Sequence, residues 1–157
     1  MANYIKEIRE LVGHKPIILN ASGGLVTNER HEALLNLRTD THNWSLPGGY
    51  LEYGETFATA CIREVKEDSG LDVEIIQSLG IFDQGFTTYP NGDVTQVISQ
   101  LYWVKPIGGH LLSAATDETL DLQYFPLDDL PPLLNQQTAD MLTAAKPTLL
   151  NKITNDL

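Results

Sequence analysis

The amino-acid sequence predicts a single α+β domain in which a mixed β-sheet lies between helices that cover both of its faces. Three observations support this prediction. The chain has 157 residues, of which 42% are hydrophobic, and this suits one globular domain with one core. Strand-like segments lie on either side of one central helical segment, and further helical segments lie towards both termini.

The first part of the chain predicts a helix followed by two strands. Apolar residues recur at helical spacing over residues 4–12, and Gly13 and Pro16 then end the pattern. Strand-like runs follow at residues 17–26 and 32–37. We expect these two strands to form a hairpin through Asn28 and its polar neighbours.

The central and last parts predict a second helix, three more strands and a closing helix. Residues 56–69 contain neither Gly nor Pro, and Gly70 supplies a C-terminal stop. Strands are expected at residues 73–82 and 94–104, separated by a turn at residues 90–93, and a short strand is expected at residues 120–125. A closing helix is expected at residues 136–145, with Pro147 near its end.

The charge of the chain is strongly acidic. Twenty-one acidic residues against ten basic ones give a formal net charge of -11, so the surface should repel phosphate backbones and anionic lipid headgroups. We therefore expect neither a nucleic-acid partner nor a membrane partner. The excess carboxylates have two explanations at this point: a solvated acidic surface, or a group of acids that binds a cation.

Cysteine usage and the N-terminal sequence predict a cytoplasmic protein. Cys61 is the only cysteine, which excludes an internal disulfide and fits a small core residue. The first ten residues carry Lys6, Glu7, Arg9 and Glu10 where an export signal would need an apolar run. Apolar stretches also stay below the roughly 18 residues of a membrane-spanning helix.

The helix predicted at residues 56–69 carries three acids on one side. At 100° per residue, Glu64, Glu67 and Asp68 fall within about 100° of one another, and only Arg63 and Lys66 lie near enough to relieve their repulsion. The opposite stripe, expected to face the core, contains Ala58, Cys61, Ile62, Val65 and Ser69. Taken alone, this acidic side favours a solvated surface over a site.

The turn before the helix favours a cation site. Pro47-Gly48-Gly49 contains two glycines, which allow a backbone carbonyl to approach a bound ion closely. Magnesium takes about six oxygen ligands and retains several waters, so two or three carboxylates and one carbonyl suffice. The turn and the acidic helix face could supply that set together.

The segment from Gly49 to Leu71 resembles the Nudix box, G-x(5)-E-x(7)-R-E-U-x-E-E-x-G-U, where U is aliphatic. The residues that match in register are Gly49, Glu55, Arg63, Glu64, Val65, Glu67, Gly70 and Leu71, and Asp68 stands where the pattern has glutamate. Segments beginning at Trp44 and Leu122 are also similar to those that flank this motif. The resemblance implies a Nudix-type α/β/α sandwich: one Nudix domain over residues 1–157, with an N-terminal helix in 1–15, a core in 16–132 and a C-terminal helix in 133–157.

The resemblance also implies a divalent-metal site for Mg²⁺, with Mn²⁺ as a substitute. Carried over by position, Glu64, Glu67 and Asp68 are the metal ligands from the helix, and the Gly48 carbonyl is a backbone ligand. Glu64 is the candidate general base, and Glu118 is its rival. Glu118 is either a further ligand or base, or an ordinary loop acid.

Other positions are expected to support the motif or contact the substrate. Gly49, Glu55, Arg63 and Gly70 are expected to be structural, with the planar guanidinium of Arg63 suited to a carboxylate. Arg38, Tyr53, Phe86 and Tyr89 are candidates for substrate contacts. Each aromatic could equally pack the fold, and Arg38 could equally be a solvent-exposed strand-end residue.

The resemblance implies metal-dependent hydrolysis of a pyrophosphate linkage. The leading substrate class is a nucleoside diphosphate linked to another group, such as ADP-ribose, a nucleotide sugar or a dinucleoside polyphosphate. The alternatives are a nucleoside triphosphate pyrophosphohydrolase and a noncatalytic nucleotide-sensing domain. Aspartate is about 1.5 Å shorter than glutamate, yet we expect the site with Asp68 to bind metal and act. Since many members of the family are homodimers, the helix at residues 4–12 packs either on its own domain or on a second subunit.

Overall fold

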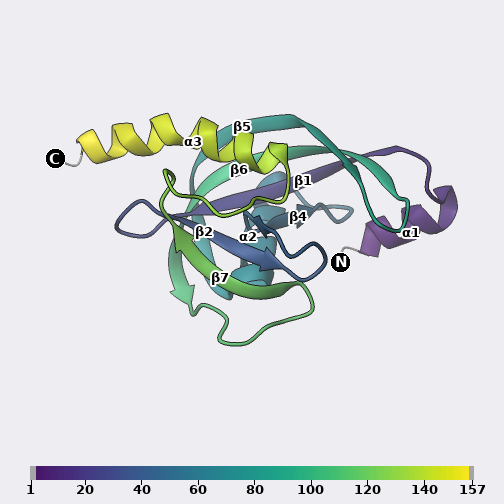
Figure 1. The fold of residues 1–157 in the computed structure, drawn as a ribbon, viewed down its shortest axis with the longest axis horizontal. Coiled ribbons are helices and arrows are strands. Elements are labelled where there is room, and N and C mark those ends of the chain that lie inside the picture. Colours follow the sequence, from purple (N-terminus) through teal and green to yellow (C-terminus); the bar gives the residue numbers. More distant parts are fainter. Residues whose placement is uncertain (1–2, 156–157) are drawn as a thin grey trace.

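The computed structural model describes residues 3–155, with side chains described as far as residue 151, and contains three helices and two β-sheets in this part of the chain. The predicted segments 1–15 and 133–157 include residues 1–2 and 156–157, which lie outside the described residues. The elements are α1 Asn3–Val12, β1 Ile17–Val26, β2 Ala33–Arg38, β3 Trp44–Ser45, β4 Gly48–Tyr50, α2 Phe57–Ser69, β5 Leu71–Thr88, β6 Val94–Gly109, β7 Thr119–Phe125 and α3 Gln136–Asn155. Figure 1 shows their arrangement.

The strands form two sheets. The larger one has the order β4-β1-β6-β5, in which β1 runs parallel to β6 and antiparallel to β4. The smaller one has the order β3-β2-β7 and is antiparallel. The prediction of mixed pairing is confirmed, but the strands are divided between two sheets.

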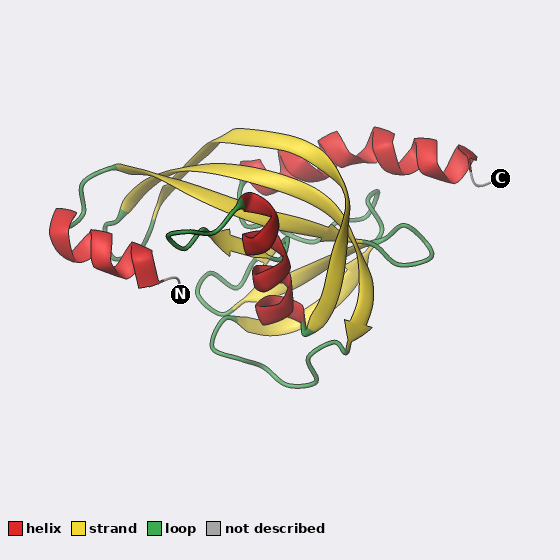
Figure 2. Cartoon of the chain, turned by 180° about the vertical axis from the view of Figure 1, so that it is seen from behind, coloured by secondary structure: helices red, strands yellow, loops and turns green. Residues whose placement is uncertain are grey.

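Helices α2 and α3 lie on opposite sides of the sheets, as Figures 1 and 2 show from opposite directions. Neighbouring residues of β2 face opposite sides of its sheet. Leu34 packs in the cluster that contains Cys61 and Val65 of α2, whereas Leu35 packs with Leu142 of α3. This alternation follows from the period of two along a strand. The predicted α+β class with helices on both faces is therefore confirmed.

The predicted hairpin at Asn28 is wrong. The Asn28 side chain does organise a turn, because its Oδ1 accepts hydrogen bonds from the backbone N–H groups of Arg30 and Glu32. Only one bridge follows, between Thr27 and Ala33, and β1 and β2 then enter different sheets. Each strand has two better partners, since β1 pairs with β4 and β6 while β2 pairs with β3 and β7.

Three elements extend beyond their predicted ends. β5 reaches Thr88 through several register shifts, and β6 continues to Gly109. α3 continues through Pro147 to Asn155, because Ala145 and Leu149 are buried in the core on either side of the proline. Proline removes one helical hydrogen bond, and the packing of this face offsets that loss.

Helix α2 ends where the sequence predicts. Thr56 is its N-cap and forms a capping box with Thr59. Gly70 is its C-cap with φ of 85° in the left-handed region, and its N–H donates to the Lys66 carbonyl. Both ends of the helix that carries the acids are thus fixed by local interactions. In residues 3–155 no helix is long and apolar enough to span a membrane.

Candidate active site

Helix α2 contributes two buried carboxylates to the lining of a large pocket. Glu64 and Asp68 have relative exposures of only 6% and 5%, although the predicted acidic side could have been a solvated surface. Ile62, predicted to face the core, is 39% exposed. The helix is therefore rotated so that Glu64 and Asp68 point inward beside Cys61 and Val65.

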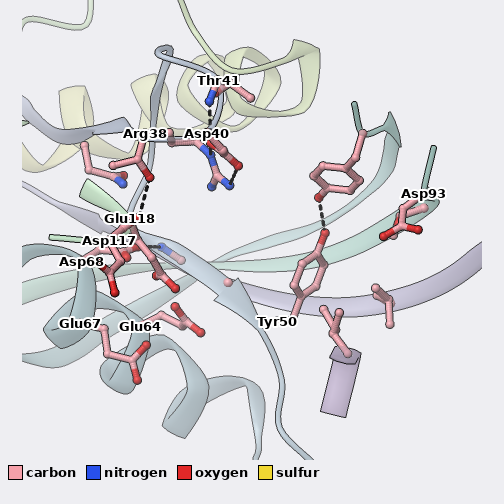
Figure 3. A pocket seen from close by; sticks show the side chains of 18 of the residues that line it. Arg38, Asp40, Thr41, Tyr50, Glu64, Glu67, Asp68, Asp93, Asp117 and Glu118 are labelled. Carbon is pink, nitrogen blue, oxygen red and sulfur yellow. Dashed lines mark hydrogen bonds and ion pairs between the residues drawn. The ribbon is translucent and has the colours of Figure 1, made fainter. Parts of the chain in front are cut away.

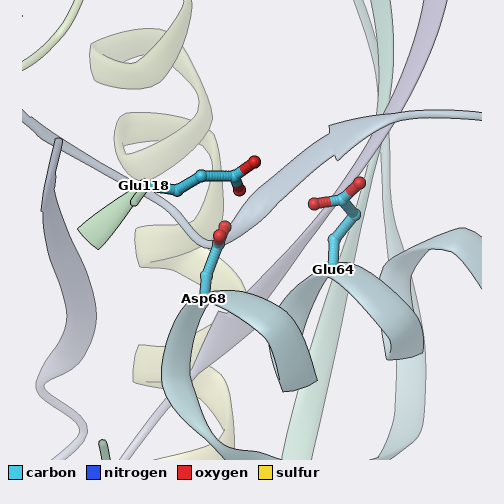
Figure 4. A group of neighbouring side chains, drawn as sticks. All are labelled: Glu64, Asp68 and Glu118. Carbon is cyan, nitrogen blue, oxygen red and sulfur yellow. The ribbon is translucent and has the colours of Figure 1, made fainter. Parts of the chain in front are cut away.

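A third carboxylate comes from a distant part of the chain. Glu118 lies immediately before β7, where Thr39 holds the preceding backbone through a 2.7 Å hydrogen bond from its Oγ1 to the Asp117 carbonyl. One carboxylate oxygen each from Glu64, Asp68 and Glu118 lie within 4.8 Å of one another. Figure 4 shows these three side chains pointing towards a common space, and we call them the acidic cluster.

Hydrogen bonds to both the side chain and the backbone of Asp68 fix its position. Its Oδ2 accepts a 3.0 Å hydrogen bond from the Gly48 N–H, and its carbonyl accepts one of 3.2 Å from Thr119 Oγ1. The shorter aspartate side chain therefore reaches the acidic cluster. Since Gly48 begins β4 and Thr119 begins β7, this residue links α2 to both sheets.

Gly49 is required by the position of Glu64. A Cβ at residue 49 would lie 2.6 Å from Cδ of Glu64 and 2.7 Å from each of its carboxylate oxygens. A side chain at residue 49 would therefore displace the Glu64 carboxylate from its observed position. The second glycine of the turn thus has a direct role in placing a cluster member.

Arg63 joins the loop before α2 to the acidic cluster. Its Nε and Nη2 donate to the two carboxylate oxygens of Glu55 at 2.8 and 2.7 Å, and Nη2 also donates to the Tyr50 carbonyl at 3.1 Å. Its Nη1 donates to Glu64 at 2.7 Å. Hydrogen bonding to Arg63 lowers the pKa of Glu55.

Glu67 and Lys66 lie at the edge of this arrangement. Glu67 is not part of the three-carboxylate group found among the described residues; its side chain is 50% exposed and lies 3.3 Å from Arg63. Lys66, expected to relieve the acidic helix face, instead pairs with Asp72 at 3.1 Å and donates to the Gly70 carbonyl. Of the two predicted cations, Arg63 is the one that contacts Glu64.

Burial makes the charged forms of two cluster members costly. Desolvation raises the pKa of Asp68 to about 7, with repulsion from Glu64 and Glu118 adding to it and the Gly48 N–H opposing it. Desolvation also raises the pKa of Glu64, although Arg63 opposes this. A divalent cation among these oxygens would compensate both penalties. The donor set of carboxylate oxygens fits Mg²⁺ or Mn²⁺.

The acidic cluster forms one end of a cavity of about 1150 Å³, which we call the main pocket. Arg38 and Tyr89, two of the predicted substrate contacts, line it. Tyr53 is 94% exposed and Phe86 lines a separate cavity of about 250 Å³. The structure therefore brings two of these four residues together with the acids.

Arg38 forms an ion pair with Asp40, and both residues line the main pocket. Its Nε and Nη2 donate to Asp40 at 2.9 and 2.7 Å. Burial by itself would lower the pKa of Arg38, but the hydrogen bonds and charge of Asp40 outweigh it and the pKa is raised. Figure 3 shows this pair above the acidic cluster, with Tyr50 to the right.

Sequence reasoning missed several residues of the main pocket. Asn3, Ile5 and Arg9 of α1 line it, as does Tyr50, whose hydroxyl lies 2.6 Å from that of Tyr89. Tyr50 directly follows the Gly-Gly turn, and this position was a usable signal. The contribution of α1 had no local signal, because it depends on tertiary packing.

Comparison with known proteins supports the motif and the fold. An archaeal protein from Methanocaldococcus jannaschii, named ADP-ribose pyrophosphatase, is 36% identical over 91 residues, which are 57% of this chain and 50% of the relative. A MutT-like protein from Streptomyces ambofaciens is 33% identical over 86 residues, 55% of this chain and 51% of the relative. This chain spans about half the length of the curated relatives it matches.

A solved structure covers more of the chain. The crystal structure of an ADP-ribose pyrophosphatase from Streptococcus suis is 30% identical and superposes with a TM-score of 0.63, covering 81% of this chain and 91% of that one. The family model for the NUDIX domain matches residues 18–145, which run from the second residue of β1 through β7 to the middle of α3. This chain therefore belongs to the NUDIX domain family.

Proposed function

We propose that this protein is a divalent-metal-dependent hydrolase of a pyrophosphate linkage, acting on a nucleoside diphosphate joined to a second group. The observation that carries the proposal is the acidic cluster, in which two buried carboxylates and Glu118 converge at one end of the main pocket. The relatives named ADP-ribose pyrophosphatase support this substrate class.

Four acids are the proposed metal ligands. One carboxylate oxygen each from Glu64, Asp68 and Glu118 lie within 4.8 Å of one another, which supports a shared ion, and the Gly48 carbonyl is the proposed backbone ligand. Glu67 lines the same pocket and is a further ligand at its outer edge. When bound, the ion would neutralise phosphate oxygens and lower the pKa of an attacking water.

The residues of the chain then have separate tasks in hydrolysis. A carboxylate of the acidic cluster accepts a proton from the attacking water. The water oxygen bonds to phosphorus while the anhydride P–O bond breaks. Glu64 is the proposed base, since its carboxylate is oriented by Arg63 and its pKa is raised by burial. Glu118 is the rival base, because it also reaches the cluster.

Arg38 is the proposed contact for the phosphate that the water does not attack. Its guanidinium is oriented by Asp40 and lines the main pocket. A planar guanidinium can donate paired hydrogen bonds to phosphate oxygens. Metal and arginine together would offset the repulsion between an acidic protein and an anionic substrate.

A second candidate function is nucleoside triphosphate pyrophosphohydrolysis at the same site. The similarity to a Bacillus subtilis protein named putative 8-oxo-dGTP diphosphatase, 33% identical over 60 residues, favours it. The two reactions differ in their products: a triphosphate gives a nucleoside monophosphate and inorganic pyrophosphate, whereas ADP-ribose gives AMP and ribose 5-phosphate.

A product screen tests the proposal. ADP-ribose, a nucleotide sugar, a dinucleoside polyphosphate and a nucleoside triphosphate would each be incubated with the protein in Mg²⁺, in Mn²⁺ and in EDTA. We expect cleavage of a diphosphate-linked compound only with metal. Preferential release of pyrophosphate from the triphosphate would favour the second candidate, and tight binding without any turnover would favour a nucleotide-sensing domain.

A further inference from the structure

The main pocket has a second end, away from the acidic cluster, that is lined by apolar and aromatic side chains. This end is bounded by Ile5 and Leu19, which are 8% and 6% exposed, and by the half-buried side chains of Tyr50 and Tyr89. Figure 3 shows Tyr50 on one side of the pocket, with Asp93 beyond it, and Glu64, Asp68 and Glu118 on the other side. We call Ile5, Leu19, Tyr50 and Tyr89 the tyrosine end.

The charged groups near the tyrosine end are engaged with the protein itself. Arg9 donates to the carbonyls of Gly13, Lys15 and Val94 and to Thr95 Oγ1, and its Nε lies 3.6 Å from Asp93. Asp93 also lies 2.7 Å from His14 Nδ1. This end therefore presents aromatic rings, aliphatic carbons and hydroxyls to a ligand, while the other end presents carboxylates.

Helix α1 forms one wall of the tyrosine end and is attached at both of its ends. At its start, the backbone N–H groups of Asn3 and Tyr4 donate to the two carboxylate oxygens of Glu52 at 2.6 and 3.2 Å. Near its end, Arg9 fixes it to β6. Because these attachments hold α1 over the pocket, Ile5 stays buried beside the tyrosines.

The attachment at Glu52 also connects α1 with the acidic cluster. The Glu52 backbone N–H donates to Glu55 Oε1 at 2.8 Å, and Glu55 is held by Arg63, which contacts Glu64. The residues of α1 precede residues 18–145, the segment that the family model matches.

We propose that the tyrosine end binds the uncharged base of the substrate's nucleoside, and that α1 is a specificity-determining wall of the active site. This inference rests on the proposed function, because the metal at the acidic cluster places the phosphates. Planar bases pack well against tyrosine rings and aliphatic side chains, and tyrosine hydroxyls can hydrogen-bond their edges. The cavity of about 1150 Å³ exceeds the roughly 300–1,000 Å³ of a typical small-ligand site, which leaves room for a base, a diphosphate and a second group.

Equilibrium binding of products tests the proposal without requiring turnover. Calorimetric titrations in Mg²⁺ would compare AMP, GMP, CMP and UMP with ribose 5-phosphate, which carries a phosphate and a sugar but no base. We expect at least one nucleotide to bind tenfold or more tightly than ribose 5-phosphate. If none does, the proposal is overturned.

Two substitutions on α1 locate the base. Ile5→Trp fills the tyrosine end and should weaken nucleotide binding at least tenfold while leaving ribose 5-phosphate within twofold. Leu11→Trp is the matched control, since Leu11 lies on the same helix but is 82% exposed and outside the pocket lining. Equal weakening of both ligands by Ile5→Trp, or an equal effect of Leu11→Trp, contradicts the assignment.

A third variant decides the matter if Ile5→Trp unfolds the protein. Glu52→Ala removes the acceptors that hold the start of α1 and leaves the pocket lining at Ile5 and the tyrosines chemically intact. We expect several-fold weaker nucleotide binding with ribose 5-phosphate unchanged, and an unchanged preference for nucleotides refutes the role of α1. Absence of hydrolysis across all substrates would refute the proposed function and leave this binding comparison intact.

Discussion

Asp68 shows how one residue combines a structural cost with a proposed function. Its carboxylate is 5% exposed, receives one backbone hydrogen bond from Gly48 and lies close to two other acids. Without a cation, such a group destabilises the fold, because burial and like charges both penalise its ionised form. A metal site gives a physical reason for placing an aspartate there.

Replacing Asp68 with Asn should reduce the pH dependence of stability of the metal-free protein. Burial raises the pKa of Asp68 to about 7, above its ordinary value, so the folded state binds more protons than the unfolded chain between about pH 4 and pH 7. Stability therefore falls as pH rises through that window. Thermal melts in EDTA at pH 5 and pH 8 should show a smaller decrease for Asp68→Asn, whose melting temperature at pH 8 should be a few degrees higher than that of the native protein.

The same variant should respond differently to metal. Mg²⁺ should raise the melting temperature of the native protein at pH 8 and have much less effect on Asp68→Asn, because the variant has lost an anionic ligand. Asp129→Asn, at an exposed site, controls for the change in net charge. An unaltered pH profile together with an unaltered metal effect would contradict the role given to Asp68.

At the scale of elements, Arg63 ties the loop between β4 and α2 to the helix. Two of its nitrogens bond Glu55, one also bonds the Tyr50 carbonyl, and the third bonds Glu64. A lysine ammonium carries its three donors on one nitrogen, so it cannot reach these separate acceptors at the same time. The loop that carries Glu52 and Glu55 therefore depends on the guanidinium shape as well as its charge.

Arg63→Lys should destabilise the fold by about 1.5–3 kcal/mol, the range for hydrogen bonds to charged groups, and should also lower kcat. Urea unfolding would measure the first effect, and rates at saturating substrate the second. Arg30→Lys at an exposed position is the matched control. Equal stability of the two variants would show that the guanidinium fork contributes nothing.

Elements with local signals were predictable from the sequence. Helix α2 has a capping threonine, no interior Gly or Pro and a terminal Gly70, and its observed bounds follow these signals. Strands β1 and β7 were likewise close to their predicted limits. In these cases propensity and tertiary structure agree.

Elements that depend on distant partners were not predictable in the same way. β1 and β2 belong to different sheets because they pair with β6 and β7, which lie far along the chain. Gly24 illustrates a similar limit: a Cβ there would lie 2.6 Å from Val65 Cγ2, so it allows α2 to pack closely on β1. The pairing of Gly24 with α2 cannot be read from either segment alone.

The candidate site shows the same division. The acids of α2 and the Gly-Gly turn followed from residue spacing and from resemblance. The inward rotation that buries Glu64 and Asp68, the exposure of Ile62 and the contribution of α1 depend on how separate elements pack. Glu118 was predictable only as one of two alternatives, because its approach depends on Thr39 holding the adjacent backbone at Asp117.

At the scale of the whole molecule, the fold gathers one pocket from segments spread along the sequence. Helix α1, the end of β2, the turn at β4, helix α2 and the loop before β7 all line it. Three of the acids that contribute to the net charge of -11 lie together in the acidic cluster, while Arg9 and Asp93 near the tyrosine end pair with each other. This polarity would orient a substrate that has charged phosphates at one end and an uncharged base at the other.

The central claim is that metal-dependent hydrolysis takes place at the acidic cluster. The most direct measurement is the initial rate of ADP-ribose cleavage in Mg²⁺ for the native protein, Glu64→Gln and the exposed-site control Glu29→Gln, each verified as folded by circular dichroism. We predict that Glu64→Gln loses activity by at least about a hundredfold while Glu29→Gln retains the native rate. Native activity in a folded Glu64→Gln protein would contradict the account.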